Sequence, residues 1–141
     1  MTLLVERARG LATVQDAGRP GWRAAGVVCG GAADRLALAV ANLLVGNAAD
    51  AAALELTLAG PTLVVERATT IALAGADLGL LIDGVAREPW RAFDVAAGAR
   101  IDFAGRRGGC RGMLAVAGGI DVPPVLGSRS TDLAARLGGL D

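Results

Sequence analysis

Short apolar runs separated by glycine, proline or aspartate dominate the hydrophobic pattern of the chain. Strands bounded by turn residues at intervals of roughly eight to twelve positions are typical of β-barrels and sandwiches. The sequence therefore predicts a mainly β protein with strands at residues 3–7, 11–15, 53–57, 62–66, 70–74, 78–82, 92–95, 100–103 and 113–117. Because Arg9-Gly10 lies between the first two strands, we expect them to form a hairpin.

A helical period begins after Asp34, whose side chain suits a helix N-cap. Apolar residues then recur three and four positions apart on one face, at Leu36, Val40, Leu43 and Leu44. Gly46-Asn47 suits the left-handed end of a helix. The pattern predicts one main helix that ends at Gly46, and a second short helix starting in residues 131–137.

A glycine-rich segment at residues 16–32 contains too many helix and strand breakers for regular structure. Long loops inside compact domains are usually functional or disordered. The polar residues around this segment, Gln15, Asp16, Arg19 and Asp34, favour the functional interpretation.

Composition excludes many familiar chemistries. The 141 residues contain 14 basic and 14 acidic side chains, so the formal net charge is zero, and lysine, histidine and tyrosine are absent. A neutral chain has no field that would steer it onto nucleic acid or an anionic membrane. Without another chain to supply the missing group, a Ser-His-Asp triad, a His-ligated metal site, a lysine Schiff base and a P-loop lysine are excluded.

The two cysteines, Cys29 and Cys110, have no C-x-x-C spacing and are expected to be free thiols. Charge follows Met1 too soon for a secretory signal. The longest apolar stretch, Leu36 to Val45, is about half the length of a membrane span. These features predict a cytoplasmic protein that binds neither nucleic acid nor membrane and holds no metal.

The first candidate constellation is Gln15-Asp16 with Arg19. An amide, a carboxylate and a guanidinium at the exit of a strand can bind a small amide or carboxylate substrate, with neighbouring glycines allowing close approach. Alternatively, Asp16 and Arg19 pair to hold the loop while Gln15 satisfies a backbone group. Spacing alone favours this second, structural interpretation.

Asn42 and Glu55 form a second constellation. Asn42 lies among apolar helix residues and needs hydrogen-bond partners, which favours a structural tie to the preceding loop. Alternation in the strand puts Glu55 opposite Leu54 and Leu56, so a solvated strand face explains it.

The third constellation is Ser128-Arg129-Ser130-Thr131 before an apolar run. Hydroxyls, a guanidinium and free backbone amides at a helix start can bind a carboxylate or phosphate. Alternatively, Ser130 or Thr131 simply caps the helix. A nearby cluster of Arg106, Arg107 and Arg111 is most simply a solvated turn, although it could face a partner chain.

In their order along the chain, these pieces are more specific than any one of them. The motifs are Thr13-Val14-Gln15-Asp16, Gly18-Arg19-Pro20-Gly21, Gly31-Ala32-Ala33-Asp34, Ala41-Asn42-Leu43-Leu44-Val45-Gly46-Asn47, Leu54-Glu55 with Gly60-Pro61, and Ala117-Gly118-Gly119-Ile120-Asp121 through Gly127-Ser128-Arg129-Ser130-Thr131. This order resembles the carboxyltransferase-domain family that includes allophanate hydrolase subunit 2, the C-type subunit of bacterial 5-oxoprolinase and the carboxyltransferase part of urea carboxylase.

The resemblance implies a cyclophilin-like β-barrel, with one main helix and a short second helix. Family members are about twice as long, and the glycine-rich end of this chain lacks a closing strand. We therefore expect residues 1–141 to be the N-terminal part of a larger, two-part domain.

Three functions follow from the resemblance. The first is a subunit of an ATP-dependent 5-oxoprolinase, which opens a cyclic amide, with ATP shared among partner subunits. Those partners would be a related barrel subunit, of the B type in 5-oxoprolinase or of the allophanate hydrolase subunit 1 type, and a lactam-utilisation subunit. The alternatives are carboxyl transfer to urea from a partner's carboxybiotin, and regulation through a kinase inhibitor.

No catalytic residue can be assigned from the sequence, and the fragment alone is expected to be inactive. The candidates for substrate binding are Gln15, Asp16, Arg19, Asp34, Asn42, Ser128, Arg129, Ser130 and Thr131.

Overall fold

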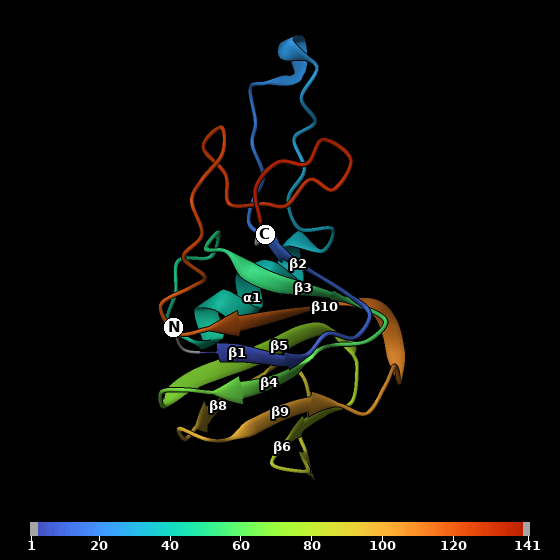
Figure 1. Cartoon of the computed structure of the whole chain (residues 1–141), viewed down its shortest axis with the longest axis vertical. Helices are drawn as coiled ribbons and strands as arrows, with labels where there is room; N and C mark the ends of the chain where they lie inside the picture. The colour runs from blue at the N-terminus through green and yellow to red at the C-terminus, as the bar shows by residue number, and fades with distance from the viewer. Residues whose placement is uncertain (1–2, 140–141) are drawn as a thin grey trace.

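Two five-stranded antiparallel sheets form the protein in a computed structural model that describes residues 3–139 (Figure 1). The first sheet has the order β1 (Leu3–Arg7), β4 (Thr62–Val65), β9 (Arg100–Phe103), β6 (Leu80–Ile82) and β7 (Val85–Ala86). The second has the order β2 (Leu11–Gln15), β3 (Ala53–Thr57), β10 (Gly108–Val116), β5 (Thr69–Asp77) and β8 (Arg91–Val95). The predicted mainly β class and most of the predicted strand positions are confirmed.

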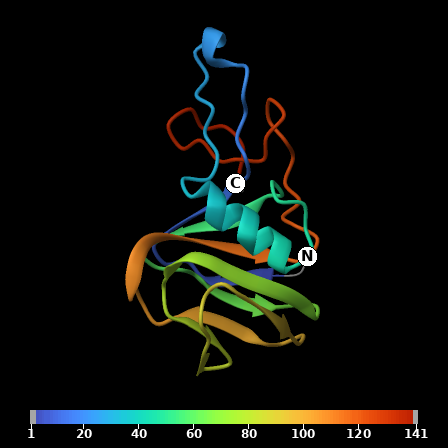
Figure 2. The ribbon, with the colours of Figure 1, turned by 180° about the vertical axis from the view of Figure 1, so that it is seen from behind.

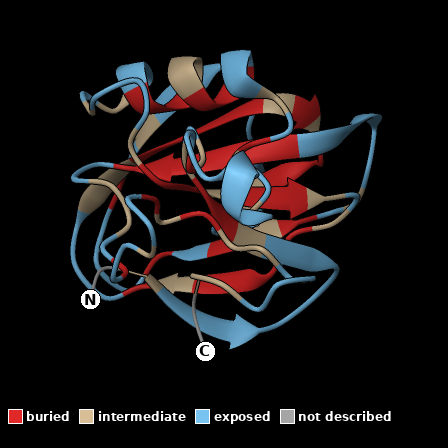
Figure 3. Cartoon of the chain, turned by 90° about the horizontal axis from the view of Figure 1, so that it is seen from above, coloured by how far each residue is buried: buried red, intermediate tan, exposed pale blue. Residues whose placement is uncertain are grey.

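The main core lies between the two sheets and is almost entirely aliphatic. Leu63 and Ile101 of the first sheet and Leu56, Leu73 and Leu114 of the second are each at most 1% exposed. Figure 3 shows these buried segments facing one another. Burial of such side chains stabilises the fold by about 1.5–3 kcal/mol each.

The predicted hairpin between the first two strands is wrong. β1 pairs with β4 in one sheet, and β2 pairs with β3 in the other. The turn at Gly10, whose φ is 62°, carries the chain from one sheet to the other. A two-stranded hairpin is barely stable by itself, so pairing with distant strands prevails over the local turn signal.

Helix α1 (Arg35–Leu44) covers β5 and β10 of the second sheet. The predicted N-cap is confirmed, because Oδ1 of Asp34 accepts a hydrogen bond from the Ala37 amide at 2.9 Å. The buried face of the helix consists of Ala37, Leu38, Ala41 and Asn42, with Ala37 and Ala41 fully buried. Leu36 and Leu43, on the face that the period singled out, are 70% and 62% exposed.

The close approach of α1 explains this choice of face. A Cβ atom at Gly75 of β5 would lie 3.2 Å from the Cβ atom of Ala37, so the helix and the sheet meet with almost no space between them. The small side chains at Ala37 and Gly75 permit this contact, whereas a leucine at position 37 would hold the two elements apart there.

The predicted second helix does not form. Residues 131–137 make a closed turn in which Asp132 and Leu137 exchange backbone hydrogen bonds of 2.8 and 3.0 Å. The Asp132 carboxylate accepts from the amides of Ala134 and Ala135, at 3.0 Å each, and Arg136 has a φ of 54°. Aspartate offers the backbone a local alternative to the helix here.

Residues 17–31 form an extended loop, here called the arm, whose outgoing and returning segments run side by side. The arm projects from the sheets along the long axis of the molecule (Figures 1 and 2). A short 3-10 turn, η1 (Arg23–Ala25), forms its tip. Segments near the C-terminus lie beside the base of the arm. No helix in residues 3–139 has the length and apolarity needed to cross a membrane. Cys29 and Cys110 are free thiols, as predicted.

Candidate functional site

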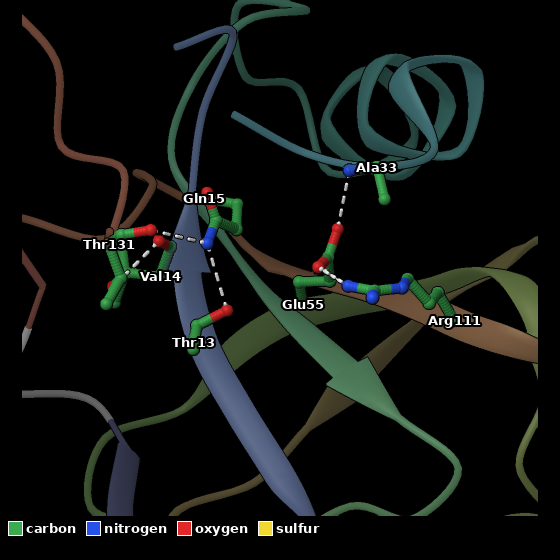
Figure 4. A network of polar contacts seen from close by, with 7 residues as sticks. All are labelled: Thr13, Val14, Gln15, Ala33, Glu55, Arg111 and Thr131. Atoms are coloured by element: carbon green, nitrogen blue, oxygen red, sulfur yellow. Dashed lines mark hydrogen bonds and ion pairs between the residues drawn. The ribbon is translucent and has the colours of Figure 1, made fainter. Parts of the chain in front are cut away.

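Polar side chains share one face of the second sheet, on the side where α1 lies. Thr13 of β2 stands opposite Glu55 of β3, and Gln15 stands opposite Ala53. Arg111 of β10 stands opposite Thr57. Because side chains alternate along a strand, Thr13, Gln15, Glu55 and Arg111 all lie on this face (Figure 4).

Glu55 is buried, which corrects the predicted solvated position. It is 4% exposed, and its Oε1 accepts from Nη1 of Arg111 at 2.6 Å. Its Oε2 accepts from the Ala33 amide at 2.7 Å (Figure 4). The segment around Ala33 that leads into α1 packs over β3 at this point. Alternation of side chains along a strand does not show which face another segment covers. Arg111, expected in a solvated turn, instead links this carboxylate to the surface.

Gln15 satisfies a backbone group, as the structural interpretation predicted. Its Nε2 donates to the Thr131 carbonyl at 3.1 Å and to Oγ1 of Thr13 at 3.0 Å. Its Oε1 is buried without a partner among the described residues. Thr131 also binds the neighbouring residue of β2, because its amide and hydroxyl both donate to the Val14 carbonyl.

Asp16 occupies the arrangement that the sequence offered as an anion site. Its carboxylate accepts from the hydroxyls of Ser128 and Ser130 at 2.7 and 2.5 Å. It also accepts from the amides of Arg129 and Gly18 at 2.6 and 2.7 Å. The anion bound by residues 128–130 is therefore the chain's own carboxylate, and because no helix starts at Ser130 or Thr131, the capping interpretation is wrong.

The pKa of Asp16 lies below its ordinary value of 3.8. Burial alone raises this pKa, but the hydrogen bonds from Ser128, Ser130, Arg129 and Gly18 favour the ionised form and together outweigh burial. The carboxylate is thus held ionised as a fixed joint between β2 and the segment before Thr131.

Arg19 makes no ion pair with Asp16 among the described residues, so the predicted pairing is wrong. The guanidinium is 1% exposed and donates to the carbonyls of Ser130 and, at 3.4 Å, of Val125. Its Nη1 has no partner there and faces Gly30, where a Cβ atom would lie 3.7 Å away. Arg129 instead directs its side chain outward to Asp121 at 3.1 Å.

Asn42 is a structural tie, but to the following loop rather than the preceding one. It is fully buried on α1; its Nδ2 donates to the Ala51 carbonyl at 2.7 Å, and its Oδ1 accepts from Nδ2 of Asn47 at 3.0 Å. The structure thus brings Gln15, Asp16, Arg19 and residues 128–131 together at the base of the arm. It places Asn42 outside that cluster.

An open groove of about 610 Å³ lies beside the Glu55–Arg111 pair. Its walls come from the approach to α1, the end of β5, the Pro89-Trp90 turn and the start of β10. The lining residues are Ala33, Asp34, Gly75, Ala76, Asp77, Pro89, Trp90 and Gly108 to Arg111. The pairing of β10 with β5 is interrupted between Gly108 and Gly112, which helps to open the groove.

The groove combines an aromatic side chain with polar groups of both signs. Trp90 is 44% exposed and has a φ of 67°, a backbone conformation rare for a bulky residue and often found at functional sites. Arg111 uses Nη1 to bind Glu55 and keeps further donors. A planar amide could stack on Trp90, receive a hydrogen bond on its carbonyl from Arg111, and donate to Asp34 or Asp77.

Of the groove residues, only Asp34 was among the candidate site residues from the sequence. Trp90 and Asp77 were missed, although the Pro89-Trp90 pair between two strands was an available signal.

No group of three or more His, Cys, Asp or Glu side chains in residues 3–139 is arranged to hold a metal ion. The turn at residues 128–130 does not suit a nucleotide's phosphates, because the Asp16 carboxylate already occupies its hydrogen-bond donors.

Residues 25–141 match the family described as carboxyltransferase domain, subdomain A and B. The chain belongs to this family. It is 48% identical over 140 residues to the C-type subunit of 5-oxoprolinase from Escherichia coli, covering 99% of this chain and 45% of that protein. It is 36% identical over 128 residues to the urea amidolyase of Saccharomyces cerevisiae, covering 90% of this chain and 7% of that protein.

Solved structures share the fold at high similarity. The protein TTHA0988 superposes with a TM-score of 0.94 at 39% identity, over 98% of this chain and 28% of that chain. The urea amidolyase of Kluyveromyces lactis also gives a TM-score of 0.94, at 34% identity, over 98% of this chain and 8% of its own. This carboxyltransferase-family chain thus spans less than half the length of these relatives.

Proposed function

We propose that this chain forms part of the C-type subunit of a cytoplasmic, ATP-dependent 5-oxoprolinase, which opens the cyclic amide 5-oxoproline to glutamate. The observation that carries the proposal is the 48% identity to such a 5-oxoprolinase subunit over nearly the whole chain. A second relative of the same name, from Haemophilus influenzae, is 38% identical over 130 residues.

The chain's own contribution is to hold the amide in the groove. Trp90 provides an apolar surface for the ring, Arg111 donates to a carbonyl or carboxylate oxygen, and Asp34 accepts from the amide N–H. The buried Glu55 fixes the Arg111 guanidinium by a 2.6 Å hydrogen bond. No residue of this chain is assigned as nucleophile or general base.

ATP chemistry belongs to partner subunits in this proposal. The sequence has no lysine for a phosphate-binding loop, and the turn at residues 128–130 is filled by Asp16. The partners are a related barrel subunit of the B type in 5-oxoprolinase and a lactam-utilisation subunit. ATP, when bound to the complex, supplies the phosphoryl group that activates an amide oxygen.

A second candidate function is carboxyl transfer from a partner's carboxybiotin to urea. The urea amidolyase relatives favour it. Urea is also a planar amide, and its N–H groups suit the groove carboxylates.

Reconstitution with the companion subunits tests the proposal. We expect 5-oxoproline-dependent ATP hydrolysis, and no consumption of carboxybiotin when urea is added. Arg111→Lys and Trp90→Ala should each raise KM at least tenfold, about 1.4 kcal/mol of lost binding. Arg107→Lys, on the adjacent turn, is the matched control. Turnover of urea but not 5-oxoproline would establish the second function and reject the first.

A further inference from the structure

The tip of the arm projects away from the sheets (Figures 1 and 2), and it and the adjoining Val28 carry large apolar side chains. Residues 20–26 are all exposed. Trp22 is 42% and Val28 59% exposed. Exposed apolar groups gathered on a projecting element are typical of protein-binding surfaces.

The arm is a built structure rather than a slack loop. The Arg19 amide donates to the Cys29 carbonyl at 2.7 Å, and the Ala32 amide donates to the Asp16 carbonyl at 2.9 Å. A Cβ atom at Gly18 would lie 2.6 Å from the Cys29 carbonyl oxygen, so the two sides of the stem, residues 17–19 and 29–31 of the arm, are in direct backbone contact. A pre-ordered arm loses little conformational entropy when it binds.

The stem is anchored to the body through the buried Arg19 and the half-buried Asp16. Arg19 donates to the carbonyls of Ser130 and Val125, and the Asp16 carboxylate at the foot of the stem holds residues 128–130. An exposed, apolar tip at the end of an anchored stem is well placed to bind in a hollow on another protein.

The tip also has a distinct charge. Between Asp16 and Asp34 the sequence has no acidic residue, and its two arginines are the buried Arg19 and the exposed Arg23. Arg23 forms no ion pair among residues 3–139. Beside it, a hollow of about 370 Å³ is lined by Arg23, Gly26, Val27, Val28 and Cys29. Tryptophan and arginine are the side chains most enriched at the energetic centre of interfaces.

We infer that the arm tip is a docking element for a companion subunit, whose surface presents an apolar hollow for Trp22 with a carboxylate beside it for Arg23. The inference rests on the proposed function for the existence of that companion. A single exposed arginine on a neutral chain is too little charge for a nucleic acid partner, so complementary chemistry points to an acidic, apolar protein surface.

The test measures the dissociation constant between this chain and its purified companion subunits at two salt concentrations. Trp22→Ala should weaken binding at least tenfold. Arg23→Glu should weaken it at least tenfold at low salt and less at high salt, because screening reduces its charge repulsion. Since Trp22 and Arg23 are exposed on a projecting segment, the melting temperature of both variants should stay close to that of the unaltered chain.

Matched controls lie elsewhere on the surface. Leu36→Ala removes another large exposed apolar side chain, on α1, and Arg67→Glu reverses another exposed arginine. Both should change the dissociation constant less than twofold. In a Trp90→Phe background, Trp22 fluorescence should shift to shorter wavelength on binding, as water leaves the indole.

If the complex forms and the tip variants bind as tightly as the unaltered chain, the docking inference is wrong and the proposed function stands. If no companion binds the unaltered chain, the proposed function and the inference both fail. If the tip variants abolish a dimer of this chain instead, the occupant is a second copy and the companion-subunit assignment is wrong. If Trp22 is already shielded from water in the longer subunit before a companion is added, the occupant is the remainder of that subunit and the companion-subunit assignment is again wrong.

Discussion

Asp16 shows how one carboxylate joins two distant parts of the chain. It accepts four hydrogen bonds, three of them from residues 128–130. The sequence correctly identified both sides of this contact as polar and specific. It could not show that each side was the other's ligand, because more than 110 residues separate them.

Asp16→Asn should destabilise the protein at neutral pH and flatten its acid dependence. The pKa of Asp16 is lowered in the folded state, so its stabilisation is complete above the unfolded value of 3.8 and is lost as pH falls through the lower folded value. We expect a loss of about 1–3 kcal/mol at pH 7 from the missing charged hydrogen bonds. Urea unfolding at pH 7 and pH 3 measures both effects. Asp121→Asn, which alters a carboxylate that is 95% exposed, is the control.

The two arginines near this joint should respond differently to lysine. Arg19→Lys loses directional donors to buried carbonyls and should lower stability by about 1–3 kcal/mol. Arg129→Lys affects an exposed pair and should cost less than about 1 kcal/mol. Thermal unfolding distinguishes them. If Arg19→Lys leaves stability intact but raises KM in the assembled complex, Arg19 binds substrate instead.

At the scale of elements, the ends of helix α1 could be predicted from the sequence, but its buried face could not. Its cap at Asp34 and its end near Gly46 depend on local backbone chemistry and were predicted. Its buried face depends on how closely the sheet approaches, which only the assembled structure determines. The same limit applies to Glu55, covered by the approach to α1, and to β1 and β2, which pair in different sheets.

Substitutions on the two faces of α1 should therefore have opposite consequences. Ala41→Leu forces extra volume into the contact with the sheet and should destabilise the protein by about 1–3 kcal/mol. Leu43→Gln alters an exposed position and should change stability by less than about 0.5 kcal/mol. Denaturant unfolding of both variants checks this, and the reverse order would contradict the assigned packing.

At the scale of the whole molecule, the proposed role of the chain is to bind the substrate amide, with the ATP-dependent chemistry on partner subunits. The sequence contains no lysine, histidine or tyrosine, so any acid-base chemistry of this chain would depend on its carboxylates and thiols. The family and the mainly β fold could be predicted from ordered motifs along the sequence. The groove could not, because Asp34, Trp90 and Arg111 come from separate elements that meet only after folding.

Residues 1–141 alone should show no turnover of 5-oxoproline or urea, with or without ATP, because the chain has no P-loop lysine and its own Asp16 fills the anion-binding turn at residues 128–130. Product formation measured with and without companion subunits checks this. Activity of the purified chain alone, surviving removal of trace contaminants, would contradict the assignment of chemistry to partners.

The joint at Asp16 also sets the order in which the protein can mature on the ribosome. Ser128 follows Asp16 by 112 residues, which at roughly 5–20 residues per second takes about 6–22 s to synthesise. During that time the foot of the arm lacks its anchor, and Trp22 is carried on an unsecured loop. The arm becomes a fixed projection only after residues 128–130 have emerged from the ribosome. A shorter nascent chain therefore cannot hold the arm tip in its final position.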